Sequence, residues 1–327
     1  MYSSDVPPAP VKIVDTFETK MSSIIQTYIL SAAAIVTIPV YIRILVILIR
    51  SRKRERFVSQ FYTISISHAL IDIIGFFCYY TAFNMRGFDI FKPFFWSLNN
   101  TIFVQYTYMQ TYFFLYARII GIILISVQRC LTVSFPSSIF NYYLRQLPWW
   151  SFFVIQWIIP IPLCLPMFLV RMEFSDPIVL SHNIAEKDLD MHYIRSAIVP
   201  LLAMIICCIC YGCIIYTFRQ NRFHNAKKTR REIKLCLQVI GLQLGLLFIT
   251  THFVLQTLFV HIGATSSIIA MRSFLPLWVG FLTFINPWMM ILVNQDVRSQ
   301  LRTTKPSENS VFQVRNTASG VGISSSR

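Results

Sequence analysis

Seven long apolar runs, separated by shorter polar segments, account for most of this 327-residue chain. A hydrocarbon layer about 30 Å thick is crossed by roughly 20 apolar residues in a helix, and each run is long enough to do so. Because backbone polar groups in lipid must be hydrogen-bonded internally, runs of this length are expected to be helices. The pattern predicts an all-α membrane protein, a bundle of seven transmembrane helices in one domain. The predicted spans cover residues 24–49, 57–83, 101–127, 150–170, 196–218, 235–260 and 273–293.

The distribution of charge orients this bundle. A net charge of +15 would suit a nucleic-acid partner, but the basic residues are not spread as such a surface requires. Segments on one side of the predicted spans hold 19 Lys and Arg against four acids, and segments on the other side hold eight against nine. Since basic residues stay on the cytoplasmic side, the amino terminus is expected outside. We expect no nucleic-acid partner, an extracellular tail at residues 1–23 and a cytoplasmic tail at residues 294–327.

Several short segments carry further expectations. Residues 1–23 lack the pattern of a cleavable signal peptide, so the first helix is expected to act as the insertion signal. The basic run at residues 50–56 is expected to orient the helix and to contact anionic membrane lipid. The composition beyond residue 303 is typical of a disordered tail. Residues 171–195 are expected to form a solvated lid.

Composition also limits the chemistry. The chain is 55% hydrophobic and only 13% charged, which excludes a soluble domain. Its eight cysteines fall within or at the edges of the predicted spans, so they are expected to pack as free thiols rather than to form disulfides. No metal-binding set, no cofactor site and no cluster of nucleophile and base stands out, so an enzyme is not expected. No pattern specifies an oligomeric state.

The second run contains a buried acid. Asp72 and His68 lie one turn apart on one helical face, and an acid at this depth is costly unless it has a partner. At 1.5 Å per residue, Asp72 lies about 24 Å from Arg56, and Arg118 of the third run lies about 16 Å from Arg129. An extended arginine can bridge that difference, so we expect Arg118 to pair with Asp72. The alternative is that Arg118 binds backbone carbonyls or water and Asp72 is neutral.

Four polar or aromatic side chains in the outer halves of two runs are candidates for ligand binding. Tyr108 and Tyr112 lie one turn apart in the third run, and His252 and Gln256 lie one turn apart in the sixth. Tyrosines near the interface also serve as a membrane belt, which is the alternative for Tyr108. Outside the membrane, Asn99 begins an Asn-Asn-Thr sequon and is a candidate glycosylation site.

The inner end of the third run carries a motif. Gln128 and Arg129 are followed by Val133 and Pro136, a spacing that resembles the D-R-Y-x-x-V-x-x-P signature of rhodopsin-like G-protein-coupled receptors. Gln128 replaces the acid of that signature, and Cys130 replaces the tyrosine. The resemblance implies that these residues take part in activation and G-protein coupling, and that Gln128 cannot form the ionic lock that an acid would offer Arg129.

The second and seventh runs extend the resemblance. Ala69 and Asp72 resemble the alanine-x-x-aspartate of the same receptors, where the acid helps to form a sodium pocket; Arg118 would then occupy the place of the ion. Asn286 and Pro287 resemble the start of N-P-x-x-Y, with methionine at the tyrosine position. The seventh run contains no lysine, so a retinal Schiff base has no anchor and an opsin is excluded.

The stretch YARIIGIILISVQRCLTVSFPSS, together with these departures, resembles the nematode serpentine chemoreceptors of the Srg superfamily, most nearly the Srv class, over about residues 20–300. This resemblance implies rhodopsin-like topology and a chemosensory receptor for a small external chemical. It further implies a heterotrimeric G-protein partner and a plasma-membrane location, in sensory-neuron cilia. The basic segment 219–234, with Arg222, Lys227 and Arg230, suits an acidic partner at the inner face; it also suits a simple topology determinant.

A different class of function stays open from the sequence. A seven-span ligand-gated channel or transporter would share the hydrophobic pattern. A transporter usually shows several intramembrane charges and broken helices in paired halves, whereas this chain has few buried charges and no evident repeat. We therefore treat the receptor as the leading interpretation and the channel or transporter as its alternative.

Overall fold

A computed structural model describes the backbone of residues 17–51, 60–99, 101–174, 177, 180, 182–183, 186–220 and 226–302. Some side chains within these ranges are not described, among them those of residues 17–25, 186–190 and 226–232. The basic run at residues 52–56 and the tail beyond residue 302 lie outside the described residues.

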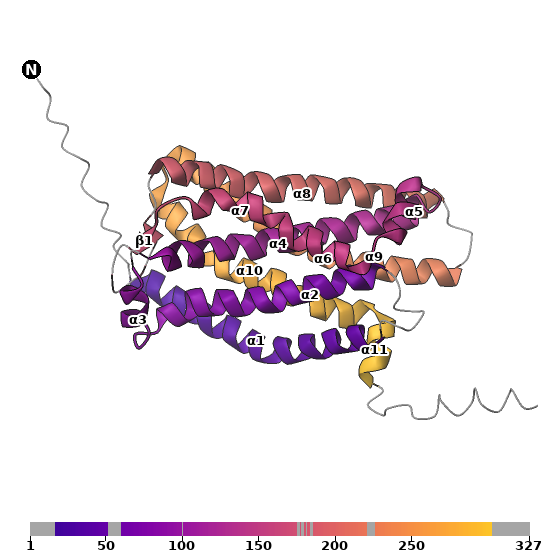
Figure 1. Ribbon diagram of the computed structural model, residues 1–327, viewed down its shortest axis with the longest axis horizontal. Helices are drawn as coiled ribbons and strands as arrows, with labels where there is room; N and C mark the ends of the chain where they lie inside the picture. Colours follow the sequence, from indigo (N-terminus) through magenta and orange to yellow (C-terminus); the bar gives the residue numbers. More distant parts are fainter. Residues whose placement is uncertain are drawn as a thin grey trace, which may run out of the picture.

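Within the described ranges, seven helices are long and apolar enough to cross a membrane, which confirms the predicted all-α, seven-span architecture. Figure 1 shows them lying side by side along the long axis of the molecule. The fourth span consists of two helices in series. The spans are formed by α1 (Phe17–Ser51), α2 (Gln60–Tyr79), α4 (Ile102–Ser134), α6 (Trp149–Ile158) with α7 (Pro160–Phe168), α8 (Glu186–Gln220), α9 (Ala226–Ile262) and α10 (Thr265–Val293).

Shorter elements gather at the two ends of the bundle. The outer end carries a π-turn η2 (Tyr80–Asn84), a 3-10 turn η3 (Met85–Gly87), α3 (Lys92–Ser97) and a hairpin of β1 (Glu173–Phe174) and β2 (His182–Asn183). The two strands are antiparallel, with Phe174 opposite His182. The inner end carries α5 (Ile139–Gln146) and α11 (Gln295–Arg302), which lie at the opposite end from α3 and β1 in Figure 1.

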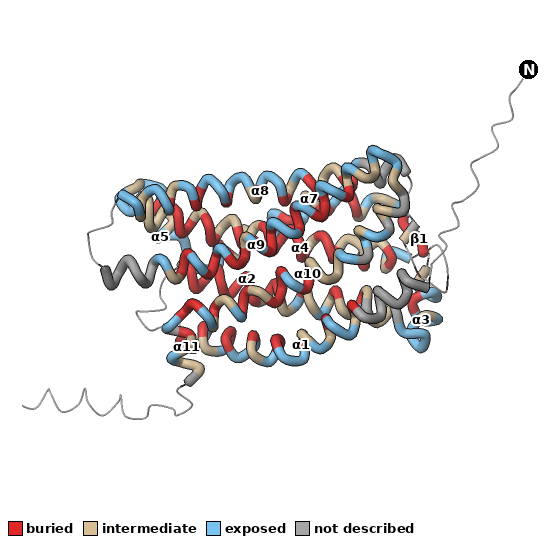
Figure 2. The backbone as a smooth tube through the Cα atoms, turned by 180° about the vertical axis from the view of Figure 1, so that it is seen from behind, coloured by how far each residue is buried: buried red, intermediate tan, exposed pale blue. Residues whose placement is uncertain are grey.

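Helix α4 is the centre of the bundle. It is 72% buried over its membrane window, against 28–61% for the other spans, and it packs against α2, α6, α7, α8 and α9. The other helices turn apolar side chains outward, as Ile205 and Ile209 of α8 illustrate. Figure 2 shows this division, with buried positions concentrated on the inward faces and exposed positions along the outer face of α8. Such an apolar exterior is what a lipid solvent requires.

The fourth span breaks where proline removes a backbone donor. Helix α6 ends at Ile158 and α7 begins at Pro160, because a proline ring lacks the N–H that would continue the ladder. Helix α4 begins at a capped position, with the Thr101 hydroxyl accepting a hydrogen bond from the Phe103 N–H at 3.3 Å.

Two glycines allow close helix approach at the middle of the bundle. A Cβ atom on Gly121 of α4 would overlap the side chains of His68 and Gln156. A Cβ on Gly75 of α2 would lie 3.0 Å from Arg118 Nη2. Small residues let membrane helices pack closely, and here they leave room for polar side chains between α2, α4 and α6.

Candidate functional site

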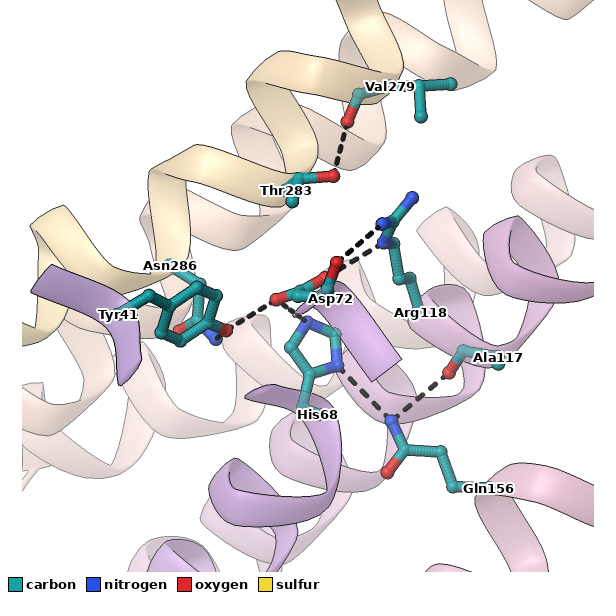
Figure 3. A network of polar contacts seen from close by, with 9 residues as sticks. All are labelled: Tyr41, His68, Asp72, Ala117, Arg118, Gln156, Val279, Thr283 and Asn286. Carbon is teal, nitrogen blue, oxygen red and sulfur yellow. Dashed lines mark hydrogen bonds and ion pairs between the residues drawn. The ribbon is translucent and has the colours of Figure 1, made fainter. Parts of the chain in front are cut away.

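A single carboxylate lies at the middle of the bundle. Asp72 of α2 is 0% exposed and Arg118 of α4 is 1% exposed. Arg118 Nε donates to Asp72 Oδ1 at 2.9 Å, and its Nη2 donates to the Asp72 backbone carbonyl at 3.3 Å. Asp72 and Arg118, which residue counting along their helices places at similar depths in the membrane, are therefore in contact (Figure 3).

The second carboxylate oxygen binds a different helix. The Tyr41 hydroxyl of α1 donates to Asp72 Oδ2 at 2.6 Å, and Asn286 Nδ2 of α10 donates to the Tyr41 oxygen at 2.6 Å. His68 Nε2, one turn before the acid on α2, lies 3.6 Å from the same oxygen. Asp72 thus joins the first, second, third and seventh spans.

The fourth span is joined to these residues through His68. The Nδ1 atom of His68 lies 3.3 Å from Gln156 Nε2 of α6. Gln156 Nε2 also donates to the Ala117 carbonyl of α4 at 3.2 Å. Figure 3 shows Tyr41, His68 and Arg118 pointing toward Asp72 and Gln156 reaching His68 and the Ala117 carbonyl, whereas Thr283 bonds to Val279 within α10. We call this set the central network: Tyr41, His68, Asp72, Arg118, Gln156 and Asn286.

The network neutralises two charges that lipid would penalise. Asp72 contributes one negative charge and Arg118 one positive charge, and their side chains are 0% and 2% exposed. A buried ion pair adds little net stability, but losing one partner leaves a buried charge without compensation. The network therefore favours one mutual arrangement of its five spans.

The motif at the inner end of α4 is packed inside the bundle. Arg129 is 2% exposed, and its Cζ lies 3.9 Å from the ring centroid of Phe61 on α2. Gln128 Nε2 donates to Thr132 Oγ1 within the same helix at 3.0 Å. The described residues around Arg129 therefore cover it almost completely in this conformation.

The other coupling candidates occupy varied positions. Val133 is partly buried against the core, and Pro136 is exposed beyond the end of α4, with its carbonyl accepting from Asn141 Nδ2 at 2.8 Å. Pro287 lies within α10. Lys227 and Arg230 belong to the first turns of α9, but their side chains are not described; Arg222 lies outside the described residues.

A cavity of about 100 Å³ opens near the outer ends of α4, α7 and α8. It is the candidate ligand site and is called the outer cavity below. The residues that line it include Tyr108, Met167, Met172, Met191, His192 and Arg195.

On its α4 side, the wall of the outer cavity is a cluster of tyrosine rings and the imidazole of His192. The Tyr108 hydroxyl lies 2.8 Å from His192 Nε2 of α8. The Tyr112 ring packs edge-on against His192, with centroids 4.5 Å apart. Tyr112 also lies 6.2 Å from Phe253 of α9. Contacts at this wall therefore reach the third, fifth and sixth spans.

The strand hairpin packs on the outer end of α4. The His182 ring lies 5.2 Å from the Tyr108 ring, and its Nε2 lies 3.4 Å from Thr107 Oγ1. Its Nδ1 lies 3.4 Å from Arg86 Nη1. Burial, assisted by the positive charge of Arg86, lowers the pKa of His182 to about 3. The imidazole is therefore neutral at physiological pH and holds the hairpin against α4.

The expected solvated lid is wrong for much of the described part of residues 171–195, although Arg171 and Pro177 are exposed. Met172, Phe174 and Leu180 are buried in a small cluster with Phe95 and Val104. The chain re-enters a helix at Glu186, ten residues before the predicted span. Apolar side chains of the loop are thereby withdrawn from water.

The predicted ligand set is only partly brought together. Tyr108 lines the outer cavity and Tyr112 packs behind it, but His252 and Gln256 are 1% and 4% exposed on α9 and do not line it. His192 and Arg195 were missed because they were assigned to a loop. Their spacing of three residues, on one face of a helix, was the available signal.

The Asn99 side chain is engaged with the hairpin. Its Nδ2 donates to the Phe174 carbonyl at 3.3 Å, and its Oδ1 accepts from the Phe174 N–H at 2.8 Å. The following Thr101 caps α4, so the sequon lies at the start of a membrane helix. Glycosylation of Asn99 remains a prediction, and the attached glycan would have to leave Nδ2 away from Phe174.

The cysteines and histidines form no metal centre in the described structure. All eight cysteines are free, and Cys207 Sγ lies 3.4 Å from Ser126 Oγ. No group of three or more His, Cys, Asp or Glu side chains among the described residues could hold a metal ion.

Comparison with known proteins gives two matches. The family model described as "Serpentine type 7TM GPCR chemoreceptor Srv" matches residues 30–305. The chain is also similar to "Serpentine receptor class V-1" of Caenorhabditis elegans, at 26% identity over 227 residues, which cover 65% of this chain and 68% of that protein. The family match includes most of the first predicted span and all of the other six.

Proposed function

This chain belongs to the Srv family of serpentine seven-transmembrane GPCR chemoreceptors, and on that premise we propose that it binds a small external chemical in the outer cavity and signals through a heterotrimeric G protein. It is a multi-pass membrane protein and a receptor, not an enzyme. We place it at the plasma membrane of sensory neurons, in their cilia, because an external chemical must reach its outer end.

One observation supports the proposal above all. The cavity wall and the inner motif lie on the same helix: Tyr108 lines the cavity, and Arg129 is 21 residues further along α4. At 1.5 Å per residue the two are separated by about 31 Å, the thickness of the hydrocarbon layer. A shift or rotation of α4 caused by a ligand at Tyr108 would therefore also move Arg129.

Activation requires the inner end to open. Arg129 is 2% exposed, and the Tyr211 hydroxyl of α8 donates to the Cys236 carbonyl of α9 at 3.2 Å. A partner can contact Arg129 only when α8 or α9 moves away from α4. The ligand must therefore bind the open packing better than the closed one, which is a shift between two populations.

The partner is recognised by charge. The inner segment at residues 219–234 holds seven Lys or Arg and one Glu, and a basic surface of this kind favours an acidic partner. Arg222, Lys227 and Arg230 belong to this segment and are proposed as contacts for the G protein. Their alternative role as topology determinants predicts no loss of coupling when they are neutralised at constant surface density.

The test compares wild type with Arg129→Ala in cells that report G-protein activation. Both are exposed to a panel of volatile and water-soluble small chemicals, and surface density is measured in parallel. Arg145→Ala is the matched control, because Arg145 is an exposed arginine at the same inner end. We expect a chemical to evoke a response that Arg129→Ala abolishes and Arg145→Ala retains.

A channel would behave differently in the same cells. A ligand-evoked current that survives both Arg129→Ala and blockade of G-protein signalling would replace the receptor with the seven-span channel. A response equally strong in wild type and Arg129→Ala, but dependent on G proteins, would remove Arg129 from the coupling mechanism.

A further inference from the structure

Arg195 brings the only charge to the outer cavity among the lining residues that the structure describes. It extends from α8 beside Tyr108 and His192, and none of the described lining residues is acidic. We infer that the outer cavity selects a small organic anion, with a carboxylate bound by Arg195 and His192 and an apolar body packed against methionines. This inference rests on the proposal that the outer cavity is the ligand site.

Arg195 differs from the other arginines of the outer half. It is partly buried and lies close enough to Tyr116, Cys164 and His192 to act on each electrostatically. Within the described ranges it makes no hydrogen bond or ion pair. The other described arginines of the outer half have partners: Arg86 with His182, Arg171 with Glu173 and Arg272 with Tyr193. Arg118, at the middle of the bundle, is paired with Asp72.

His192 supplies an independent observation. It is 6% exposed, and its Nε2 is occupied by the Tyr108 hydroxyl at 2.8 Å. Its Nδ1 is buried and has no hydrogen-bond partner among the described residues. Buried polar atoms are nearly always hydrogen-bonded, so this nitrogen calls for a partner that the described residues do not supply. We place that partner in the cavity that His192 lines.

The donor and acceptor capacity of the two His192 ring nitrogens favours a ligand that accepts a hydrogen bond. A neutral imidazole has one N–H donor and one acceptor nitrogen. When the Tyr108 hydroxyl donates to Nε2, the proton resides on Nδ1, which then requires an acceptor. A carboxylate provides one oxygen for Nδ1–H and another for the guanidinium of Arg195. A ligand ammonium would meet a like charge and no acceptor at Nδ1.

The remaining walls limit the size and character of the ligand. Met167, Met172 and Met191 line the cavity, and methionine adapts its shape to irregular apolar groups. The volume of about 100 Å³ is smaller than the roughly 150 Å³ of an engineered cavity that holds benzene. A short aliphatic or small cyclic acid fits this space, whereas a large anion does not.

A lipid headgroup is the competing occupant for Arg195. The residue lies four positions inside the outer end of the candidate span Met191–Gln220, from which a long arginine can reach the interface. A phosphate at the membrane surface would satisfy the guanidinium without contacting His192 Nδ1. The two occupants are therefore separable by experiment.

The test uses purified full-length receptor in lipid nanodiscs and measures thermal stabilisation, which does not depend on a G protein. Butanoate is titrated against pentan-1-ol and pentylamine, which have the same number of non-hydrogen atoms, and against inorganic phosphate at equal ionic strength. A ligand that binds only the folded state raises its stability with concentration. Nanodiscs of zwitterionic and of anionic lipid are compared.

Three variants accompany the wild type. Arg195→Gln removes the charge, Arg195→Lys retains it, and Arg171→Gln removes an exposed outer arginine that does not line the cavity. We expect butanoate alone to stabilise the wild type, with apparent affinity falling roughly 10- to 100-fold in Arg195→Gln. Arg195→Lys should retain part of the affinity, which separates loss of charge from misfolding, and Arg171→Gln should behave as wild type.

The outcomes that overturn the inference are distinct from those that overturn the proposed function. Equal stabilisation by the alcohol or the amine, stabilisation by phosphate alone, or no stabilisation by any probe would overturn the organic-anion site. Loss of butanoate binding in anionic nanodiscs only would assign Arg195 to lipid headgroups. Butanoate binding that requires Arg195 but never activates a G protein would support the anion site and contradict the signalling proposal.

Discussion

Arg118 on α4 and Asp72 on α2 form an ion pair of 2.9 Å, with side-chain exposures of 2% and 0%. These are the two charges that face each other at the middle of the bundle, and the guanidinium Nε bonds directly to Asp72 Oδ1. The carboxylate is therefore balanced by a covalently attached charge whose position depends on the packing of α4 against α2.

Removing either charge should destabilise the receptor more than removing both. We expect Asp72→Asn and Arg118→Gln each to lower the free energy of unfolding by about 3–5 kcal/mol, because each leaves the other charge buried and unpaired. The double variant, which leaves no buried charge unpaired, should lose less than either single variant. Thermal unfolding of purified protein and surface density in cells measure this. Thr283→Val is the control, since Thr283 bonds only to the Val279 carbonyl of its own helix; additive losses would contradict the pairing.

Gly121 should tolerate no side chain. A methyl group at Gly121→Ala would overlap His68 and Gln156, and overpacking of this kind typically costs about 1–3 kcal/mol. Gly212→Ala is the matched control, because nothing lies within 4 Å of a Cβ at that position. That change should be neutral or should stabilise by roughly 0.5–1 kcal/mol. Equal melting temperatures for the two variants would show that the His68–Gln156 contact is not needed.

Gln128 should permit basal signalling. Its amide bonds to Thr132 on its own helix, and a neutral side chain offers Arg129 no ionic partner. We expect wild-type cells to show second-messenger output above that of mock-transfected cells, and Gln128→Asp to lower it at equal surface density. Gln128→Asn, which keeps a neutral amide, should not. Wild-type output equal to that of mock-transfected cells would count against a loosely held closed state.

Acidification should loosen the hairpin through His182. Its pKa falls from 6.5 to about 3 in the folded protein, so between these values the unfolded hairpin binds a proton that the folded one does not. Stability due to this group is complete above pH 6.5 and declines as the pH falls toward 3. We expect the melting temperature of wild type to drop more than that of His182→Gln when the pH is lowered from neutral. Replacing the exposed His261 by Gln should leave the wild-type profile unchanged.

The features of this fold that depend only on the number of residues along a helix could be predicted from the sequence. The seven spans follow from the length of the apolar runs, and the contact of Asp72 with Arg118 follows from the constant rise per residue. The other members of the central network could not be joined to it. Whether Tyr41, Gln156 and Asn286 face Asp72 depends on the rotation of each helix about its axis, which tertiary packing determines.

The outer cavity was harder to foresee, because hydrophobicity marks the membrane and not the ends of helices. Helix α8 starts at Glu186, although the charged residues 186–190 read as loop. His192 and Arg195 were placed in that loop, so their common helical face was overlooked. His252 and Gln256 had the expected spacing on α9, but that spacing does not say which face of α9 meets the cavity.

The central network also has a consequence for biosynthesis. Asp72 enters the membrane 46 residues before Arg118, and an unneutralised acid at the bilayer centre disfavours insertion by about 2.5–3.5 kcal/mol. We therefore expect the nascent second span to be incompletely accommodated in lipid until α4 emerges beside it. Asn286 follows Tyr41 by 245 residues, so the connection to α10 is made last. The same six side chains that hold the finished bundle therefore impose an order on its assembly, in which Tyr41 of α1 can reach Asp72 first, the charge of Arg118 follows with α4, and α10 completes the network.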